Sequence, residues 1–305
     1  MRILVVGAGA TGGYFGGRLA ASGRHVTFLV RAKRAEQLRA GGLQIKSPHG
    51  DLSVVPQVVT ADGIAGPFDA VLLAVKAYAL EGALADMAPA VGPGTVVVPL
   101  LNGMRHMDML LERFGPEPIL GGVCVVATTL DGQGRVVQLA EMQELAYGER
   151  DGSASDRITA LDGGLGGAGF RARRSETILQ DMWEKWMLLA ALGAATCLMR
   201  GTVGDIEAVP GGAAFTLAVL AECAAVAGAA GFAPRDKFLA RAQSMLTAKG
   251  SSFASSMYRD MQGNGPVEAE HIVGDLVRRG GETGVVTPLL DVALAHLRVY
   301  GARRG

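Results

Sequence analysis

The sequence predicts a mixed α/β protein, with a parallel sheet in the N-terminal half and an all-helical C-terminal half. Two observations support this fold class. Apolar runs of strand length alternate with helical patterns in the first half, as they do in successive βαβ units. From about Glu176 onward the chain shows long helical patterns and almost no strand signal. We therefore expect two domains, residues 1–169 and 170–305, with the active site in the cleft between them.

The predicted strands are rich in Val, Ile and Leu without polar alternation, which is typical of strands that helices cover on both faces. They are Ile3–Val6, Val26–Val30, Ala70–Val75, Thr95–Pro99 and Ile119–Val126, with Arg135–Leu139 and Leu145–Tyr147 as antiparallel additions. The glycine-rich segment Asp162–Gly169 is the expected hinge. Helices are predicted over Gly12–Ser22, Thr177–Met199, Gly212–Ala230, Pro234–Leu246, Pro266–Arg278 and Pro288–Tyr300.

Composition excludes several classes of protein. The 305 residues carry 29 basic and 29 acidic side chains, so the basic excess of a nucleic-acid or anionic-membrane binder is missing. The three cysteines are widely spaced in apolar runs, which indicates buried, reduced thiols. No histidine spacing suggests a metal site, and the first apolar run is too short for a signal peptide. We expect a cytoplasmic protein, with a homodimer as one possible assembly through the Ala-rich helices.

The first turn of the chain carries a dinucleotide-binding pattern. Gly7-Ala8-Gly9-Ala10-Thr11-Gly12 matches G-x-G-x-x-G, directly after a predicted strand and before a predicted helix. In a Rossmann domain the first glycine makes the tight turn, the second admits the pyrophosphate, and the third allows close helix packing. The alternative is a plain strand–helix turn that tolerates glycine, but the position of the motif favours a Rossmann domain.

The end of the second strand predicts which dinucleotide is bound. NAD enzymes place an acidic residue there for the ribose hydroxyl, whereas NADP enzymes need a cation for the phosphate. This strand runs into Arg31, followed by Lys33 and Arg34, with no acidic residue before Glu36. We therefore predict NADP(H), with Arg31 as the first candidate for the phosphate because its guanidinium binds phosphate in a fork. The alternative is that these cations form the solvated first turn of a helix.

Lysine is scarce, with 6 residues against 23 arginines, and two lysines stand in unusual places. Lys76 follows a predicted strand, so it lies at the carboxyl edge of the sheet, where ligands bind in open α/β folds. Lys185 lies in an apolar helix between two tryptophans, and burial would tune such an amine to act as a general acid. The alternative for Lys185 is a salt bridge with Asp181 or Glu184.

Polar residues in two further segments complete the candidate site. Asn102 follows a predicted strand and is suited to bind a carbonyl or a nicotinamide, or to cap the next helix. Ser256 ends a serine-rich stretch and precedes Glu268, a set suited to the carboxylate and hydroxyl of a small acid. From the residues alone, capping and turn chemistry is the favoured explanation of the serines.

A set of short motifs, taken together and in order, resembles the ketopantoate reductase family over nearly the whole chain. The motifs are G-A-G-A-T-G, the strand-ending arginine, V-K-A, N-G-M, W-E-K-W and S-S-M followed by glutamate. The resemblance implies hydride transfer from NADPH to the keto carbon of ketopantoate (2-dehydropantoate), a step of pantothenate biosynthesis. It implies that Lys185 donates the proton and that Glu268 binds the substrate hydroxyl and holds Lys185. Ser256 would contact the carboxylate, with Asn102 and Lys76 at the nicotinamide and substrate.

One departure bears on the substrate. Better-known members of that family carry asparagines four and eight residues after the catalytic lysine, where this chain has Leu189 and Gly193. Loss of a hydrogen-bonding contact changes selectivity by orders of magnitude, so a less polar 2-keto acid competes with ketopantoate as the expected substrate. Two further hypotheses are an opine-like or 3-hydroxy acid dehydrogenase and a non-catalytic NADP(H)-sensing protein.

Overall fold

The computed structural model describes residues 1–304, and its contacts divide the chain into two compact units. The first contains Met1–Leu101 and His106–Leu179, and the second contains Asn102–Arg105 and Gln180 onward. The boundary therefore lies about ten residues after the predicted one. The short segment Asn102–Arg105 belongs to the second unit although its sequence neighbours lie in the first.

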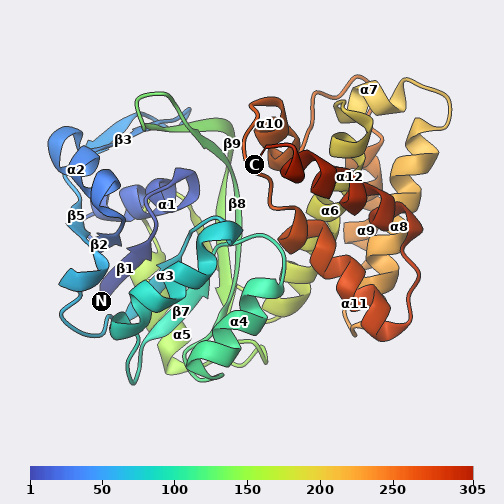
Figure 1. The fold of residues 1–305 in the computed structure, drawn as a ribbon. Coiled ribbons are helices and arrows are strands. Elements are labelled where there is room, and N and C mark those ends of the chain that lie inside the picture. Colours follow the sequence, from blue (N-terminus) through green and yellow to red (C-terminus); the bar gives the residue numbers. More distant parts are fainter. Residues whose placement is uncertain (305) are drawn as a thin grey trace. The chain divides into compact units, whose positions relative to one another are not determined.

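The first unit is built on a five-stranded parallel sheet, as predicted (Figure 1). Its strands are β1 (Arg2–Val6), β2 (His25–Leu29), β5 (Gln57–Val59), β6 (Ala70–Leu73) and β7 (Val96–Pro99), in the order β5-β2-β1-β6-β7. The chain thus starts in the middle of the sheet, and the order in which strands are added reverses beside β1. This is the arrangement of a dinucleotide-binding domain. Strands β1, β6 and β7 are almost fully buried, which explains their unbroken apolar sequences.

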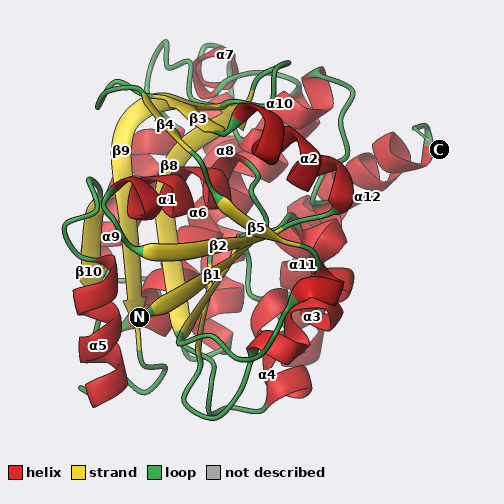
Figure 2. Ribbon diagram, turned by 90° about the vertical axis from the view of Figure 1, so that its left-hand side faces the viewer, coloured by secondary structure: helices red, strands yellow, loops and turns green. Residues whose placement is uncertain are grey.

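A second sheet flanks the first, and the sequence predicted it poorly. Strands β8 (Gly121–Leu130) and β9 (Val136–Gly148) form a long antiparallel pair (Figure 2). This sheet is completed by β3 (Leu43–Lys46), β4 (Leu52–Val54) and β10 (Arg171–Arg174). The predicted strand at 119–126 begins with one parallel bridge to β7, Ile119↔Val97, and continues as β8 in the antiparallel pair. The two predicted short additions are parts of the single strand β9.

Helix α1 (Ala10–Ala21) contacts strands of both sheets. Its Tyr14, Phe15 and Leu19 are fully buried, and the phenolic oxygen of Tyr14 donates a hydrogen bond to Gln143 of β9. The other helices of this unit are α2 (Ala32–Gly41), α3 (Leu80–Met87), α4 (Arg105–Phe114), α5 (Asp156–Leu165) and the single 3₁₀ turns Ala61–Gly63, Ala77–Ala79 and Ala88–Ala90. Packing on both faces therefore fixes the helix that follows the glycine motif.

The predicted hinge at Asp162–Gly169 is wrong. These residues form the last turn of α5 and its connection to β10, which pairs in parallel with β9 from Arg171↔Glu144 onward. The phenol of Tyr147 on β9 donates a 2.5 Å hydrogen bond to Asp162, which ties α5 to the sheet. The four-residue strand Arg-Ala-Arg-Arg has no apolar pattern, so the sequence hid its membership of the first unit.

The second unit is helical, as predicted. Its elements are α6 (Ile178–Met199), α7 (Val203–Glu207), α8 (Gly212–Ala229), α9 (Asp236–Leu246), α10 (Ser256–Gln262), a π-helical turn (Glu270–Gly274), α11 (Asp275–Thr283) and α12 (Pro288–Ala302). Helix α6 is buried over most of its circumference, with Met187, Ala190, Ala191 and Leu192 at most 1% exposed. One predicted helix differs: 266–278 begins with a turn of π-helix and continues as α11.

Two apolar features of the chain have a clear place in the fold. Helix α8 is the one helix among residues 1–304 that is long and apolar enough to cross a membrane by length and composition alone. Within its unit it contacts α9, α11 and α12, and Leu220, Cys223 and Val226 are buried. The other two cysteines, Cys124 and Cys197, are also buried, as predicted.

Candidate active site

The glycine motif adopts the geometry expected of a dinucleotide loop. Gly7 has φ +96°, and a Cβ there would lie 3.0 Å from the carbonyl oxygen of Ala74, so the turn after β1 requires glycine. A Cβ on Gly12 would lie 2.0 Å from the carbonyl oxygen of Gly7, so only glycine lets α1 pack this closely. Gly9 differs, because a Cβ there would meet nothing within 4 Å. The backbone at Gly9 is therefore open to a ligand at the first turn of α1, which contains no acidic side chain.

The cations after β2 divide into two groups. Arg31 is exposed at the N-cap of α2, and Lys33 is exposed in the first turn of that helix, which carries no acidic residue. Arg34 donates hydrogen bonds to the carbonyl of Ala8 at 3.2 Å and to that of Gly134 at 3.0 Å. Its partial burial lowers its pKa. Arg34 thus ties the glycine loop to the turn between β8 and β9, which leaves Arg31 and Lys33 as the cations presented to solvent.

Lys76 lies where the sequence predicts it, after β6 at the carboxyl edge of the parallel sheet. It is exposed and stands at the N-cap of the 3₁₀ turn Ala77–Ala79. The glycine loop follows β1, the neighbour of β6 in the sheet, so both lie at the same edge. This edge is where open α/β sheets bind ligands.

The second unit gathers three other predicted residues in one small recess of about 20 Å³. Asn102, Ser256 and Glu268 all line it, although more than 150 residues separate the first two in the sequence. The recess has room for about one water molecule, so it is too small to enclose a substrate. Its seven lining residues are Asn102, Leu189, Ser255, Ser256, Met257, Glu268 and Ile272.

A close backbone contact places Asn102 in the recess. The next residue, Gly103, has φ +84°, and a Cβ there would lie 2.6 Å from the carbonyl oxygen of His271 in the π-helical turn. Helix α4 begins only at Arg105, so Asn102 does not occupy the capping position. The carboxamide therefore lines the recess instead of completing a helix end.

The two serines at the start of α10 have different roles. Ser255 is buried at the N-cap, accepts a 2.9 Å hydrogen bond from the backbone N–H of Tyr258, and shares a 2.9 Å hydrogen bond with Thr196. Ser256 is the first residue of the helix and is exposed at the recess. Capping thus explains Ser255 and does not explain Ser256.

Lys185 is partly buried on α6, one helical turn before Leu189, which lines the recess. Residues four apart on a helix lie on one face, about 6 Å apart along its axis. The two carboxylates that the sequence offers as partners of Lys185 both interact with Arg235: Asp181 accepts at 2.6 Å, and Glu184 accepts a 2.8 Å hydrogen bond from Nε. Glu184 is 4% exposed, so this ion pair fixes α6 against the start of α9.

The π-helical turn joins the parts of the recess. It begins two residues after Glu268 and contains Ile272, whose carbonyl oxygen accepts a 2.9 Å hydrogen bond from the indole of Trp186 on α6. Trp186 is 1% exposed, and Arg279 lies over its ring at 5.8 Å. Turns of this kind are rare overall, but those that occur often lie at functional sites. No pattern in the sequence predicts this turn, or the contributions of Met257 and Ile272 to the recess.

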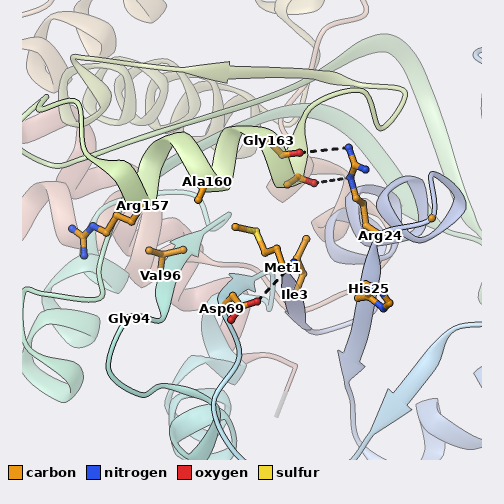
Figure 3. A pocket seen from close by; sticks show the side chains of 12 residues that line it. Met1, Ile3, Arg24, His25, Asp69, Gly94, Val96, Arg157, Ala160 and Gly163 are labelled. Atoms are coloured by element: carbon orange, nitrogen blue, oxygen red, sulfur yellow. Dashed lines mark hydrogen bonds and ion pairs between the residues drawn. The ribbon is translucent and has the colours of Figure 1, made fainter.

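A larger cavity of about 620 Å³ lies in the first unit, at the opposite edge of the parallel sheet (Figure 3). Residues that begin or precede strands line it, including His25 and Asp69, together with α5. Arg24 donates hydrogen bonds there to the carbonyls of Gly164 at 3.0 Å and Gly166 at 2.8 Å. None of the predicted site residues lines this cavity, so its size does not make it the candidate active site. Residues 1–304 also contain no group of three or more His, Cys, Asp or Glu side chains placed to hold a metal ion.

Comparisons with known families match both units. The family described as "Ketopantoate reductase PanE/ApbA" matches residues 3–152, and its C-terminal model matches residues 177–301. The chain is 36% identical over 306 residues to "Uncharacterized oxidoreductase YkpB" of Bacillus subtilis, with 100% of both chains covered.

Two further relatives carry more specific names. A "2-dehydropantoate 2-reductase" of Mesorhizobium japonicum is 27% identical, with 100% of this chain and 99% of that protein covered. The crystal structure of a protein described as a putative ketopantoate reductase from Ralstonia solanacearum superposes with a TM-score of 0.88 at 30% identity. That match covers 100% of this chain and 98% of the other.

Proposed function

Because this chain belongs to the ketopantoate reductase family of oxidoreductases, we propose that it catalyses the NADPH-dependent reduction of a small 2-keto acid to the 2-hydroxy acid. Ketopantoate is the reference substrate of this proposal, with pantoate as the product and a cytoplasmic place in pantothenate biosynthesis. The observation that carries it is the recess in which Asn102, Ser256 and Glu268 meet. Leu189 of the same recess lies one helical turn from Lys185 on α6.

The first unit would hold the cofactor through its glycine loop. A Cβ at Gly7 or Gly12 would lie within 3.0 Å of a backbone oxygen, whereas a Cβ at Gly9 would meet nothing within 4 Å. This combination suits a pyrophosphate above the first turn of α1. Arg31, exposed at the N-cap of α2, would bind the ribose phosphate and so select NADPH over NADH. When bound, the nicotinamide supplies the hydride.

The second unit would hold the keto acid and supply the proton. Lys185, as an ammonium group, donates a proton to the oxygen of the keto group while the hydride reaches the keto carbon. The substrate gains two electrons and two hydrogens and leaves as the 2-hydroxy acid. A positioned general acid of this kind contributes about 10²–10⁴-fold to the rate.

The predicted site residues would each recognise a different group of the substrate. The hydroxyl of Ser256 would bind the carboxylate, and Asn102 and Lys76 would bind at the nicotinamide and keto group. A carboxylate would repel that of the substrate, so Glu268 is assigned to holding Lys185.

A test of the proton donor is NADPH oxidation, followed by absorbance with a panel of 2-keto acids, for wild type and Lys185→Ala. Lys237→Ala is the matched control, because Lys237 is exposed on α9 of the same unit. We expect a loss of about 10²–10⁴-fold in kcat for Lys185→Ala and none for the control. Equal activity of the two variants would remove Lys185 from the mechanism.

The same assay separates the competing functions. An opine-like or 3-hydroxy acid dehydrogenase would oxidise NADPH with other substrates and not with 2-keto acids alone. A non-catalytic sensor would bind NADPH and turn over none of the panel. For cofactor choice, Arg31→Ala should raise KM for NADPH without changing KM for NADH. Arg39→Ala, at the exposed end of the same helix, is the control.

A further inference from the structure

We infer that the recess of the second unit selects a 2-keto acid whose substituent is a branched hydrocarbon, in preference to the hydroxylated substituent of ketopantoate. The inference rests on the proposed function and concerns the same site. The evidence for it is the identity of the side chains that α6 and the start of α10 contribute to the recess.

The first observation is Leu189. This side chain lines the recess directly, one helical turn from Lys185, so it lies on the face of α6 that the substrate would meet. An isobutyl group neither donates nor accepts a hydrogen bond. A substrate hydroxyl placed against it would lose its water without gaining a partner.

The second observation concerns the position one further turn along α6. Gly193 carries no side chain, and a Cβ there would lie 2.7 Å from the methyl carbon Cε of Met257. Met257 is 5% exposed and lines the recess. The thioether therefore occupies the space that a side chain at 193 would need, and the glycine and the methionine form one packed unit.

Ile272 supplies a third apolar group. Its carbonyl accepts a hydrogen bond from the indole of Trp186, which fixes the backbone here, and its side chain is 6% exposed and lines the recess. Leu189, Met257 and Ile272 thus come from three elements and form the apolar part of the recess, while Asn102, Ser256 and Glu268 form the polar part. The polar part is sufficient for the groups that every 2-keto acid shares, namely the carboxylate and the keto oxygen.

The expected size of the preference follows from what such a surface does. An apolar pocket discriminates by about 10²-fold against an isostere that adds a hydroxyl group, whereas a site built to bind the hydroxyl discriminates by about 10⁴–10⁵-fold in the other direction. The two kinds of site therefore predict opposite signs, which a matched pair of substrates resolves.

The matched pair is ketopantoate and the 2-keto acid in which a methyl group replaces its hydroxyl. For the wild type we expect kcat/KM to favour the methyl compound by about 10–100-fold. Leu189→Asn should move the ratio of the two kcat/KM values toward ketopantoate by at least about 10-fold. Leu188→Asn, the same change at the preceding residue of α6, should leave the ratio where it is.

The outcomes separate this inference from the proposed function. Wild-type preference for ketopantoate would overturn the inference and leave the proposed function standing. Preference for the methyl compound with equal effects of the two asparagine variants would refute the assignment to Leu189. No turnover of any 2-keto acid, with NADPH binding intact, would refute both. Since the wild-type ratio alone gives the sign, the test does not depend on the folding of a variant.

Discussion

The contact between Gly103 and the π-helical turn can be tested by a single methyl group. Gly103→Ala places a Cβ at φ +84°, a conformation that costs an L-residue about 1–2 kcal/mol. It also places that carbon 2.6 Å from the carbonyl oxygen of His271. Relief of this overlap requires backbone movement on one side, at a cost of about 1–3 kcal/mol. The expected loss in free energy of unfolding is therefore about 2–5 kcal/mol.

Gly211 provides the matched control for this prediction. It has the same φ of +84° and lies in the same unit, but a Cβ there would meet nothing within 4 Å. Gly211→Ala should cost only the conformational part, about 1–2 kcal/mol. The difference between the two variants, measured by urea denaturation, isolates the overlap with His271.

The overlap should also appear in the kinetics, because Asn102 precedes Gly103 and lines the recess. A displacement of catalytic or substrate-binding groups by about 1 Å costs up to about 10²-fold in rate. We expect kcat/KM of Gly103→Ala to fall by about 10–100-fold and that of Gly211→Ala to be unchanged. If the two variants match in both stability and kcat/KM, the contact does not position Asn102.

Three other predictions concern the fold and its titrating groups. Trp186→Phe leaves a buried carbonyl without its donor and should cost about 1–3 kcal/mol more in urea denaturation than Trp183→Phe; an equal loss would refute a role for the hydrogen bond. Burial raises the pKa of the Cys197 thiol to about 12, so iodoacetamide should modify it only after unfolding, and rapid labelling of the native protein would contradict this. A hydrogen bond from Arg157 lowers the pKa of Glu149 below its ordinary value of 4.5, so this carboxylate stabilises the fold above that pH and the stabilisation is lost as the pH falls through its folded pKa. Glu149→Gln should therefore be less stable than wild type at neutral pH and approach it in acid, and a constant difference across this range would exclude the linkage.

How well the sequence predicts the structure differs from element to element for physical reasons. The buried strands β1 and β6 and helix α6 carry long apolar runs, and such runs predict elements directly. Strand β10 reads Arg-Ala-Arg-Arg and forms because β9 offers a free edge, which no local pattern encodes. The hinge prediction failed for this reason, since glycine content marked a helix end and not a domain boundary.

The recess shows the same division. Asn102, Ser256 and Glu268 stand out as polar residues at element ends, and the structure brings them together. Met257 and Ile272 resemble ordinary core residues in the sequence. Their place at the recess depends on the start of α10 and on the π-helical turn, which arise from packing between segments far apart in the chain.

The assignment of Asn102–Arg105 to the second unit limits how this protein can be divided. The chain crosses between units at Leu101–Asn102, Arg105–His106 and Leu179–Gln180, so no single cut separates them. A fragment that starts at Gln180 would lack the carboxamide at the recess and the glycine that abuts His271. The two halves of the chain therefore cannot be exchanged as independent segments. A chimaera that grafts a foreign C-terminal half onto this N-terminal half must carry those four residues from the same donor as the helices.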